Sequence, residues 1–129
     1  MRLREPQEWK EKYPLVFRAD DSPYIECYVG WYSILDEFLG WMEDVIRRTK
    51  ETDTPGIAQI KEKYGSLRIY LNIPDFWYTK YQEECQYIDK AIEMAVNQSM
   101  ETCELCGKPG HVVGTGWLAC RCSECKRKV

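Results

Sequence analysis

Two cysteine pairs near the carboxyl end carry the clearest chemistry in this sequence. Cys103 and Cys106 form one Cys-x-x-Cys pair, Cys122 and Cys125 form a second, and fifteen residues separate the two. Thiolates at this spacing are the ligands of zinc ribbons, in which each pair holds one side of a tetrahedral ion. Gly107 follows the first pair and can take the positive φ that its turn needs. The spacing predicts structural zinc, because four thiolates leave no position for water or substrate.

Two further residues near these pairs are possible alternate ligands. Cys120 lies two positions before Cys122, and His111, the single histidine, lies between the pairs. Cys122 mirrors the spacing of the first pair whereas Cys120 would need a wider loop, so we expect Cys120 to remain a spare thiol. With four thiolates available, His111 is expected to be a loop residue. Trp117 is expected to pack towards the rest of the chain.

The composition is that of one globular domain. The chain has 129 residues, 44% of them hydrophobic, and a formal net charge of −3. No apolar stretch is long enough for a membrane span, and the first residues contain no apolar signal region. We therefore expect a cytoplasmic protein, in the host cytoplasm if a phage encodes it, with no membrane partner. Seven cysteines without an export signal favour a metal site over disulfides.

The hydrophobic pattern predicts an α+β fold in which two main helices pack with a β-hairpin and a zinc ribbon follows. Apolar residues recur at three- and four-residue steps over 31–50 and 79–100, which is typical of amphipathic helices. Between these helices, 57–73 alternates apolar and polar residues, as a half-buried hairpin does. Gly65 and Ser66 are the expected turn of this hairpin.

The chain is expected to divide into a body and a ribbon. Residues 1–101 form the α+β body in this prediction, and residues 102–129 form the zinc ribbon, packed on the body as one compact unit. The first thirty residues are mostly irregular by pattern, with a short helix at Trp9, a turn at 20–23 and a short strand at 24–29.

Several side chains are assigned to the core by their place in the pattern. Ala58 and Ile60 are expected to point inwards from the first hairpin strand. Cys27 and Cys85 lie among apolar neighbours and are expected to be core thiols. The helix over 79–100 leads into Cys103 and would orient the ribbon.

The sequence contains no recognisable catalytic constellation. A single histidine does not suffice for a ββα-metal nuclease, and the His-x-Glu of zinc deaminases is missing. No Gly-x-x-x-x-Gly-Lys loop or Gly-x-Ser-x-Gly elbow occurs. Pairs of adjacent carboxylates are expected to be exposed, so we predict that the chain is not an enzyme. These pairs are Asp20-Asp21, Asp36-Glu37 and Glu43-Asp44.

A group of aromatic residues suggests a protein partner. Trp31, Tyr32 and Trp77 are expected to be at least partly exposed, and exposed aromatics commonly anchor protein interfaces. A protein partner is favoured over nucleic acid because the chain is acidic, which disfavours binding to phosphates.

A set of basic residues supports nucleic acid as the alternative partner. The hairpin would place its basic and aromatic side chains on one solvent face, and the ribbon would add a basic tip. The hairpin residues are Lys61, Lys63, Arg68 and Tyr70; the tip residues are Arg121, Lys126, Arg127 and Lys128.

Three motifs resemble a group of small uncharacterised proteins of bacteria and phages. The motifs are GWYSILD at 30–36, IKEKYGSLRIY at 60–70, and CxxCG followed by GW and CxxC within 103–125. The resemblance implies a shared fold and a mobile-element origin, and it implies no activity. In that pattern a tryptophan stands five residues before the third ligand, which selects Cys122 over Cys120, and Cys120 departs from the pattern.

Overall fold

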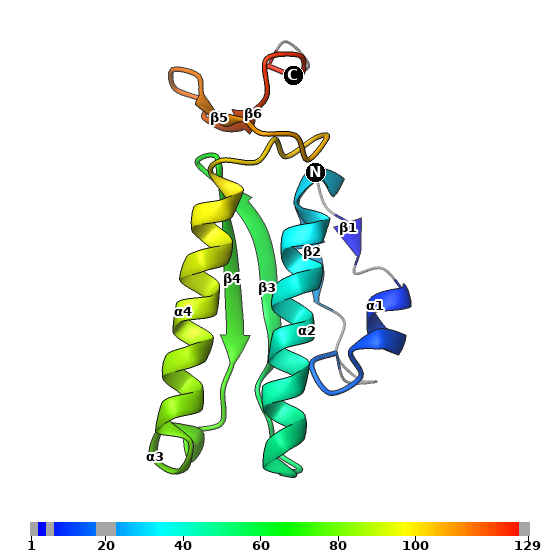
Figure 1. Ribbon diagram of the computed structural model, residues 1–129, viewed down its shortest axis with the longest axis vertical. Coiled ribbons are helices and arrows are strands. Elements are labelled where there is room, and N and C mark those ends of the chain that lie inside the picture. The colour runs from blue at the N-terminus through cyan, green and yellow to red at the C-terminus, as the bar shows by residue number, and fades with distance from the viewer. Residues whose placement is uncertain (1–2, 5–6, 18–22, 127–129) are drawn as a thin grey trace.

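A computed structural model confirms the predicted α+β fold (Figure 1). It describes the chain apart from residues 1–2, 5–6, 18–22 and 127–129, so most of the turn expected at 20–23 lies outside the described residues. In chain order the elements are β1 (Leu3–Arg4), α1 (Gln7–Lys12), β2 (Tyr24–Glu26), a 3-10 turn (Val29–Trp31), α2 (Tyr32–Thr49), β3 (Gly56–Lys63), β4 (Ser66–Asn72), α3 (Trp77–Lys80), α4 (Gln82–Ser99), β5 (His111–Val113) and β6 (Ala119–Arg121).

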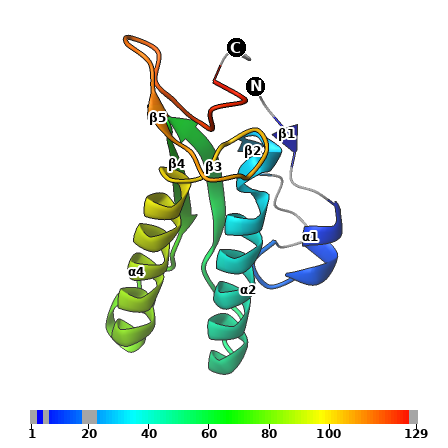
Figure 2. The same cartoon turned by 45° about the horizontal axis from the view of Figure 1, so that its top comes forward.

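The main sheet has four strands in the order β1-β2-β3-β4, of which the β3–β4 hairpin and β2 were predicted, β2 as a longer strand over 24–29. β1 pairs with β2 antiparallel, β2 with β3 parallel and β3 with β4 antiparallel. A parallel pair needs a crossover connection, and α2 supplies it between β2 and β3. Helices α2 and α4 contact each other and lie side by side over one face of this sheet (Figures 1 and 2).

Helix α2 matches the amphipathic helix predicted over 31–50. Its apolar residues, among them Leu35, Leu39 and Met42, are fully buried, because their spacing places them on one side of the helix. Arg47 and Arg48 lie in its last turn, where their positive charges interact favourably with the negative end of the helix dipole.

The hairpin turn lies one residue earlier than predicted. Tyr64 and Gly65 both have positive φ, 56° and 83°, as the two central residues of a type I′ turn require. Ser66 therefore belongs to β4, opposite Lys63. The prediction for Ala58 is also wrong: a register shift between Ile57 and Gln59 leaves Ala58 exposed and Ile57 buried.

The second helix is interrupted at Tyr81, so α3 and α4 replace the single helix predicted over 79–100. Helix α4 confirms the amphipathic pattern predicted over 79–100, because Cys85, Ile88, Ala95 and Ser99 are buried on one side of it. Cys27 is also buried.

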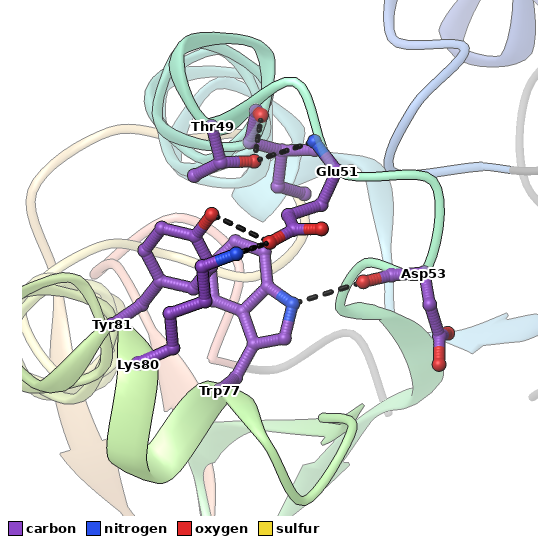
Figure 3. Close-up of polar contacts among 7 residues, drawn as sticks. Thr49, Glu51, Asp53, Trp77, Lys80 and Tyr81 are labelled. Carbon is purple, nitrogen blue, oxygen red and sulfur yellow. Dashed lines mark hydrogen bonds and ion pairs between the residues drawn. The ribbon is translucent and has the colours of Figure 1, made fainter.

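Two tryptophans that were expected at the surface are instead core residues. Trp31 and Trp77 both have 0% exposure, because each ring packs in the core while its indole N–H finds a backbone acceptor. The N–H of Trp77 donates to the carbonyl oxygen of Asp53 at 2.9 Å (Figure 3). Beside it, one carboxylate oxygen of Glu51 accepts from Lys80 at 2.7 Å, which ties the end of α2 to α3.

A buried carboxylate holds the segment before β2 against α2. Glu43 is 3% exposed and accepts hydrogen bonds from the backbone N–H groups of Leu15 and Val16, at 3.0 and 3.1 Å. Arg47, one turn later, pairs with it at 3.0 Å. The expectation that Glu43 is a surface carboxylate is therefore wrong; only its neighbour Asp44 is exposed.

We predict that Glu43→Ala destabilises the protein by about 2–4 kcal/mol, because two largely buried N–H groups lose their acceptor. Urea denaturation followed by circular dichroism measures this loss. Asp44→Ala is the matched control and should change the free energy of unfolding by less than about 0.5 kcal/mol. Equal effects of the two substitutions would contradict this role of Glu43.

Candidate metal centre and binding surfaces

The four predicted cysteine ligands come from two separate loops. Helix α4 ends at Ser99, and the chain then enters the turn that carries Cys103 and Cys106, here called the first knuckle; the turn with Cys122 and Cys125 is the second. The β5–β6 hairpin then returns the chain, so that Cys122 and Cys125 follow β6. Figure 2 places this ribbon across one end of the helices and the sheet.

The four sulfur atoms lie at metal-binding distance. The Sγ atoms of Cys103, Cys106, Cys122 and Cys125 are all within 4.8 Å of one another. The Cys106–Cys122 distance is 3.6 Å. A tetrahedral zinc ion with Zn–S bonds of about 2.3 Å sets its sulfurs roughly 3.8 Å apart, so the arrangement fits such an ion. The four cysteines are thus arranged to bind a metal ion through four thiolates, a donor set that suits zinc.

The first knuckle owes its shape to a left-handed glycine. Gly107 has φ +81°, as predicted, and its N–H donates to the carbonyl oxygen of Cys103 at 2.9 Å. The N–H of Cys103 donates in turn to Lys108 at 2.7 Å, which closes the turn. A β-carbon at Gly107 would also lie 3.3 Å from the carbonyl oxygen of Gly30, so glycine suits both the turn and the packing.

The pKa values of the clustered cysteines favour a cation at their centre. Burial raises the pKa of Cys103, but hydrogen bonds from backbone N–H groups in both knuckles outweigh it and lower the pKa to about 6. The pKa of Cys122 is lowered as well, since backbone N–H groups of its own knuckle outweigh burial. Burial and the neighbouring sulfurs raise the pKa of Cys125 to about 12. A divalent cation would relieve this mutual repulsion and stabilise all four thiolates.

Neither alternate ligand joins the cluster formed by the described residues. Cys120 lies opposite Val112 in the β5–β6 ladder and is fully buried in the main core, where burial raises the pKa of its thiol to about 11. His111 belongs to β5, opposite Arg121, and its side chain is exposed. Cys120 lies within β6 and packs into the main core, whereas Cys122 follows the end of this strand, where the chain turns towards the other three cysteines.

The ligand loop rests directly on the start of α2. The N–H of Gly30 donates to the carbonyl oxygen of Glu104 at 2.7 Å, and the indole N–H of Trp31 donates to Thr102 at 2.8 Å. A β-carbon at Gly30 would lie 2.2 Å from the carbonyl oxygen of Cys103, closer than real β-carbons approach. The metal ligands are therefore joined to the body through the buried Trp31.

A buried ion pair forms inside the ribbon and removes one of the expected basic tip residues. Arg121 Nε donates to Glu104 at 3.1 Å, and both side chains are almost completely buried. The prediction that Arg121 belongs to a basic tip is therefore wrong. Lys126 is exposed as expected, whereas Arg127 and Lys128 lie outside the described residues.

Trp117 does not pack onto the body, contrary to expectation. Its side chain is 74% exposed. It lies in the loop that joins β5 to β6, after Gly114 and Gly116, which both have positive φ, and it borders a polar pocket of about 360 Å³ with Glu62 and Glu104.

The residues of the predicted basic surface lie together on the hairpin. Lys61 faces Arg68 across the ladder, and its Nζ lies 5.8 Å from the ring centre of Tyr70, which is exposed. Lys63 lies near the turn and is exposed. Tyr32, by contrast, is half-buried against Trp9, with ring centres 5.2 Å apart.

The structure also contains a groove between α2 and α4 that sequence reasoning missed, here called the α2–α4 groove. It has a volume of about 310 Å³ and a mainly apolar lining that includes Phe38 and Ala91. Met94 and Tyr87 project beside it with 62% and 59% of their surface exposed. Tyr87 meets Trp41 edge-on across the helices at 6.4 Å. The sequence could have indicated this groove, because Tyr87 and Met94 are large apolar residues that fall outside the buried side of α4.

The described residues contain two further groups of coupled ionisable side chains, both of which tie elements together. Asp36 accepts from Tyr13 at 2.7 Å and pairs with Lys12 at 3.2 Å, and the hydrogen bond from Tyr13 leads the effects that lower its pKa. The hydrogen bond from Lys80 is likewise the main effect that lowers the pKa of Glu51. Each carboxylate already has partners that explain its shift.

No protein family, curated protein or solved structure matches this chain. The likeness to bacterial and phage proteins is therefore a resemblance of motifs; of its features, the structure supports the clustering of the four cysteines. Within the described residues, no helix combines the length and apolar character that crossing a bilayer requires.

We predict that Cys106→Ser abolishes stoichiometric zinc binding, because Cys106 belongs to the four-cysteine cluster and its exposed side chain contributes little to packing. Elemental analysis of the purified protein and its melting temperature measure the outcome. Cys120→Ala is the matched control: it removes a nearby thiol that lies outside the cluster and should leave one zinc per chain. Full zinc content in Cys106→Ser, or its loss in Cys120→Ala, would assign the ligands differently.

We predict that zinc-dependent stability is lost as the pH falls, beginning below the pKa of about 6 that Cys103 has without metal and extending further into acid, because bound zinc holds the thiolates deprotonated. A thiol whose folded pKa is depressed stabilises the folded state above its ordinary pKa, and this stabilisation is lost as the pH falls through the folded value. Protons then compete with zinc for the thiolates. A chromogenic chelator can follow release during an acid titration, with Cys106→Ser as the metal-free control. Complete zinc retention at clearly acidic pH would contradict this assignment.

Proposed function

We propose that this protein is a non-enzymatic protein-binding module in which zinc has a structural role. Four thiolates would fill the coordination of the ion, so that no position remains for a substrate or an activated water. Asp36 and Glu51, whose pKa values are lowered, serve as ties between elements, and Glu104, whose pKa is raised by burial, is paired with Arg121. Catalysis would need an open position or a free group of this kind.

The structural role of zinc follows from the small size of the ribbon. The described part of the ribbon, 102–126, contains two three-residue strands, and Leu105 packs as a partly buried neighbour against Cys103, Cys122 and Cys125. Such a segment buries too little apolar surface to fold alone, so a bound ion would supply much of its folding energy. We propose that zinc thereby holds the ribbon and the body together as one unit.

The α2–α4 groove is the observation that carries the proposed binding function. Its exposed Tyr87 and Met94 both stand on α4, whose other side is buried against the sheet, so a polar face would be expected at their positions. Aromatic residues anchor protein interfaces, and methionine adapts its shape to apolar partners. The groove therefore suits a protein surface.

Nucleic-acid binding remains the alternative because Lys61 and Arg68 lie side by side on the hairpin with Tyr70. It is the weaker proposal. Arg121 is engaged in a buried ion pair, and the chain as a whole carries a net charge of −3. Binding to phosphates depends on positive charge that is free to replace counterions.

Photo-crosslinking in expressing cells tests the protein-binding role. With p-benzoylphenylalanine in place of Met94, we expect a discrete protein adduct, because this side chain borders the groove. The same probe in place of Tyr78, which is exposed on α3 away from the groove, is the matched control and should give none. Absence of an adduct at position 94, or equal adducts at both positions, would contradict the proposal.

A further inference from the structure

We propose that the partner of the α2–α4 groove is a second copy of this chain, docked groove to groove about a two-fold axis. This inference rests on the proposed function and names its partner. In Figure 1 the outer sides of α2 and α4 face the viewer, and no described segment lies across them. The dimer would place the four helices in the middle and one sheet on each outer side.

Charge complementarity selects a second copy as the occupant. Glu37 on α2 and Lys90 on α4 both line the groove, from opposite sides, and both are exposed. In a two-fold interface, residue i meets residue j of the partner while j meets i. An axis midway between Glu37 and Lys90 passes through the groove and brings each of them to its opposite charge on the other copy. The groove is thus complementary to itself.

The apolar residues between these charges supply the surface that such a contact would bury. Met94 projects near the small side chain of Ala91, which lies three residues before it on the same face of α4. Residues one turn apart on a helix are neighbours, so a long side chain lies beside a shallow depression. Two such surfaces facing each other can interdigitate, with Met94 of each copy entering the depression of the other. Trp41 and Tyr87 would close the sides.

The two charges would give this dimer its orientation more than its affinity. Exposed ion pairs contribute little by themselves, but like charges placed face to face suppress association. Reversing one charge in both copies therefore creates two repulsive contacts. Reversing Glu37 in one copy and Lys90 in the other creates two attractive contacts again.

Analytical ultracentrifugation of charge-reversed variants tests the proposal. We expect the zinc-loaded wild-type chain to dimerise, and Glu37→Lys or Lys90→Glu alone to weaken the dimer roughly tenfold. An equimolar mixture of the two variants should regain the dimer, and native mass spectrometry should identify one copy of each. Glu11→Lys, an exposed position on α1 away from the groove, is the matched control and should dimerise like the wild type. Met94→Glu should dissociate the dimer.

The outcomes separate this inference from the proposed function. A wild-type chain that stays monomeric at high micromolar concentration, while the probe at position 94 captures a different protein, overturns the second copy as partner and leaves the binding function standing. A monomer without any adduct overturns both. A dimer unaffected by Met94→Glu, or a mixture of charge variants that stays monomeric, overturns the groove-to-groove arrangement.

Discussion

The close approach between Gly30 and the first cysteine knuckle is the constraint on which the rest of the structure depends. A β-carbon at position 30 would lie 2.2 Å from the carbonyl oxygen of Cys103, so these backbones can touch only because the residue is glycine. The hydrogen bond from Trp31 to Thr102 lies beside this contact, and α2 begins directly after it. The same few atoms therefore position the metal ligands and the start of the central helix.

Polar contacts hold the helix pair at its two ends, and its middle depends on apolar packing. At one end the ribbon contacts Gly30 and Trp31; at the other, Glu51 and Trp77 join the end of α2 to α3 (Figure 3). Such ties fix the separation of α2 and α4, because hydrogen bonds tolerate little change in distance. Because both helices are held in place, the α2–α4 groove between them is a constant feature of the surface, and Met94 borders it.

Local pattern was sufficient for features that depend on neighbours in sequence. The period of α2, the alternation in the hairpin and the two Cys-x-x-Cys spacings each depend on residues a few positions apart, and the structure contains the helix, the hairpin and the cysteine cluster. Trp31, Arg121 and Glu43 were misassigned because their burial depends on distant partners: Thr102, Glu104 and the backbone at 15–16. The bulge at Ala58 and the turn at Tyr64 were missed because a shift of one residue changes the register but hardly changes the apolar pattern.

The cost of removing a charge from water explains which charges of this protein are buried and which border apolar surface. Glu43 and Glu104 lie in the interior, and each has hydrogen-bond donors at about 3 Å, since an unpaired buried charge would be strongly destabilising. Glu37 and Lys90 lie beside apolar side chains but in contact with water, which solvates them without a partner. Any surface that covers this groove must remove that water and replace it with opposite charges. The groove therefore discriminates among partners by charge position, while its apolar centre favours association without regard to identity.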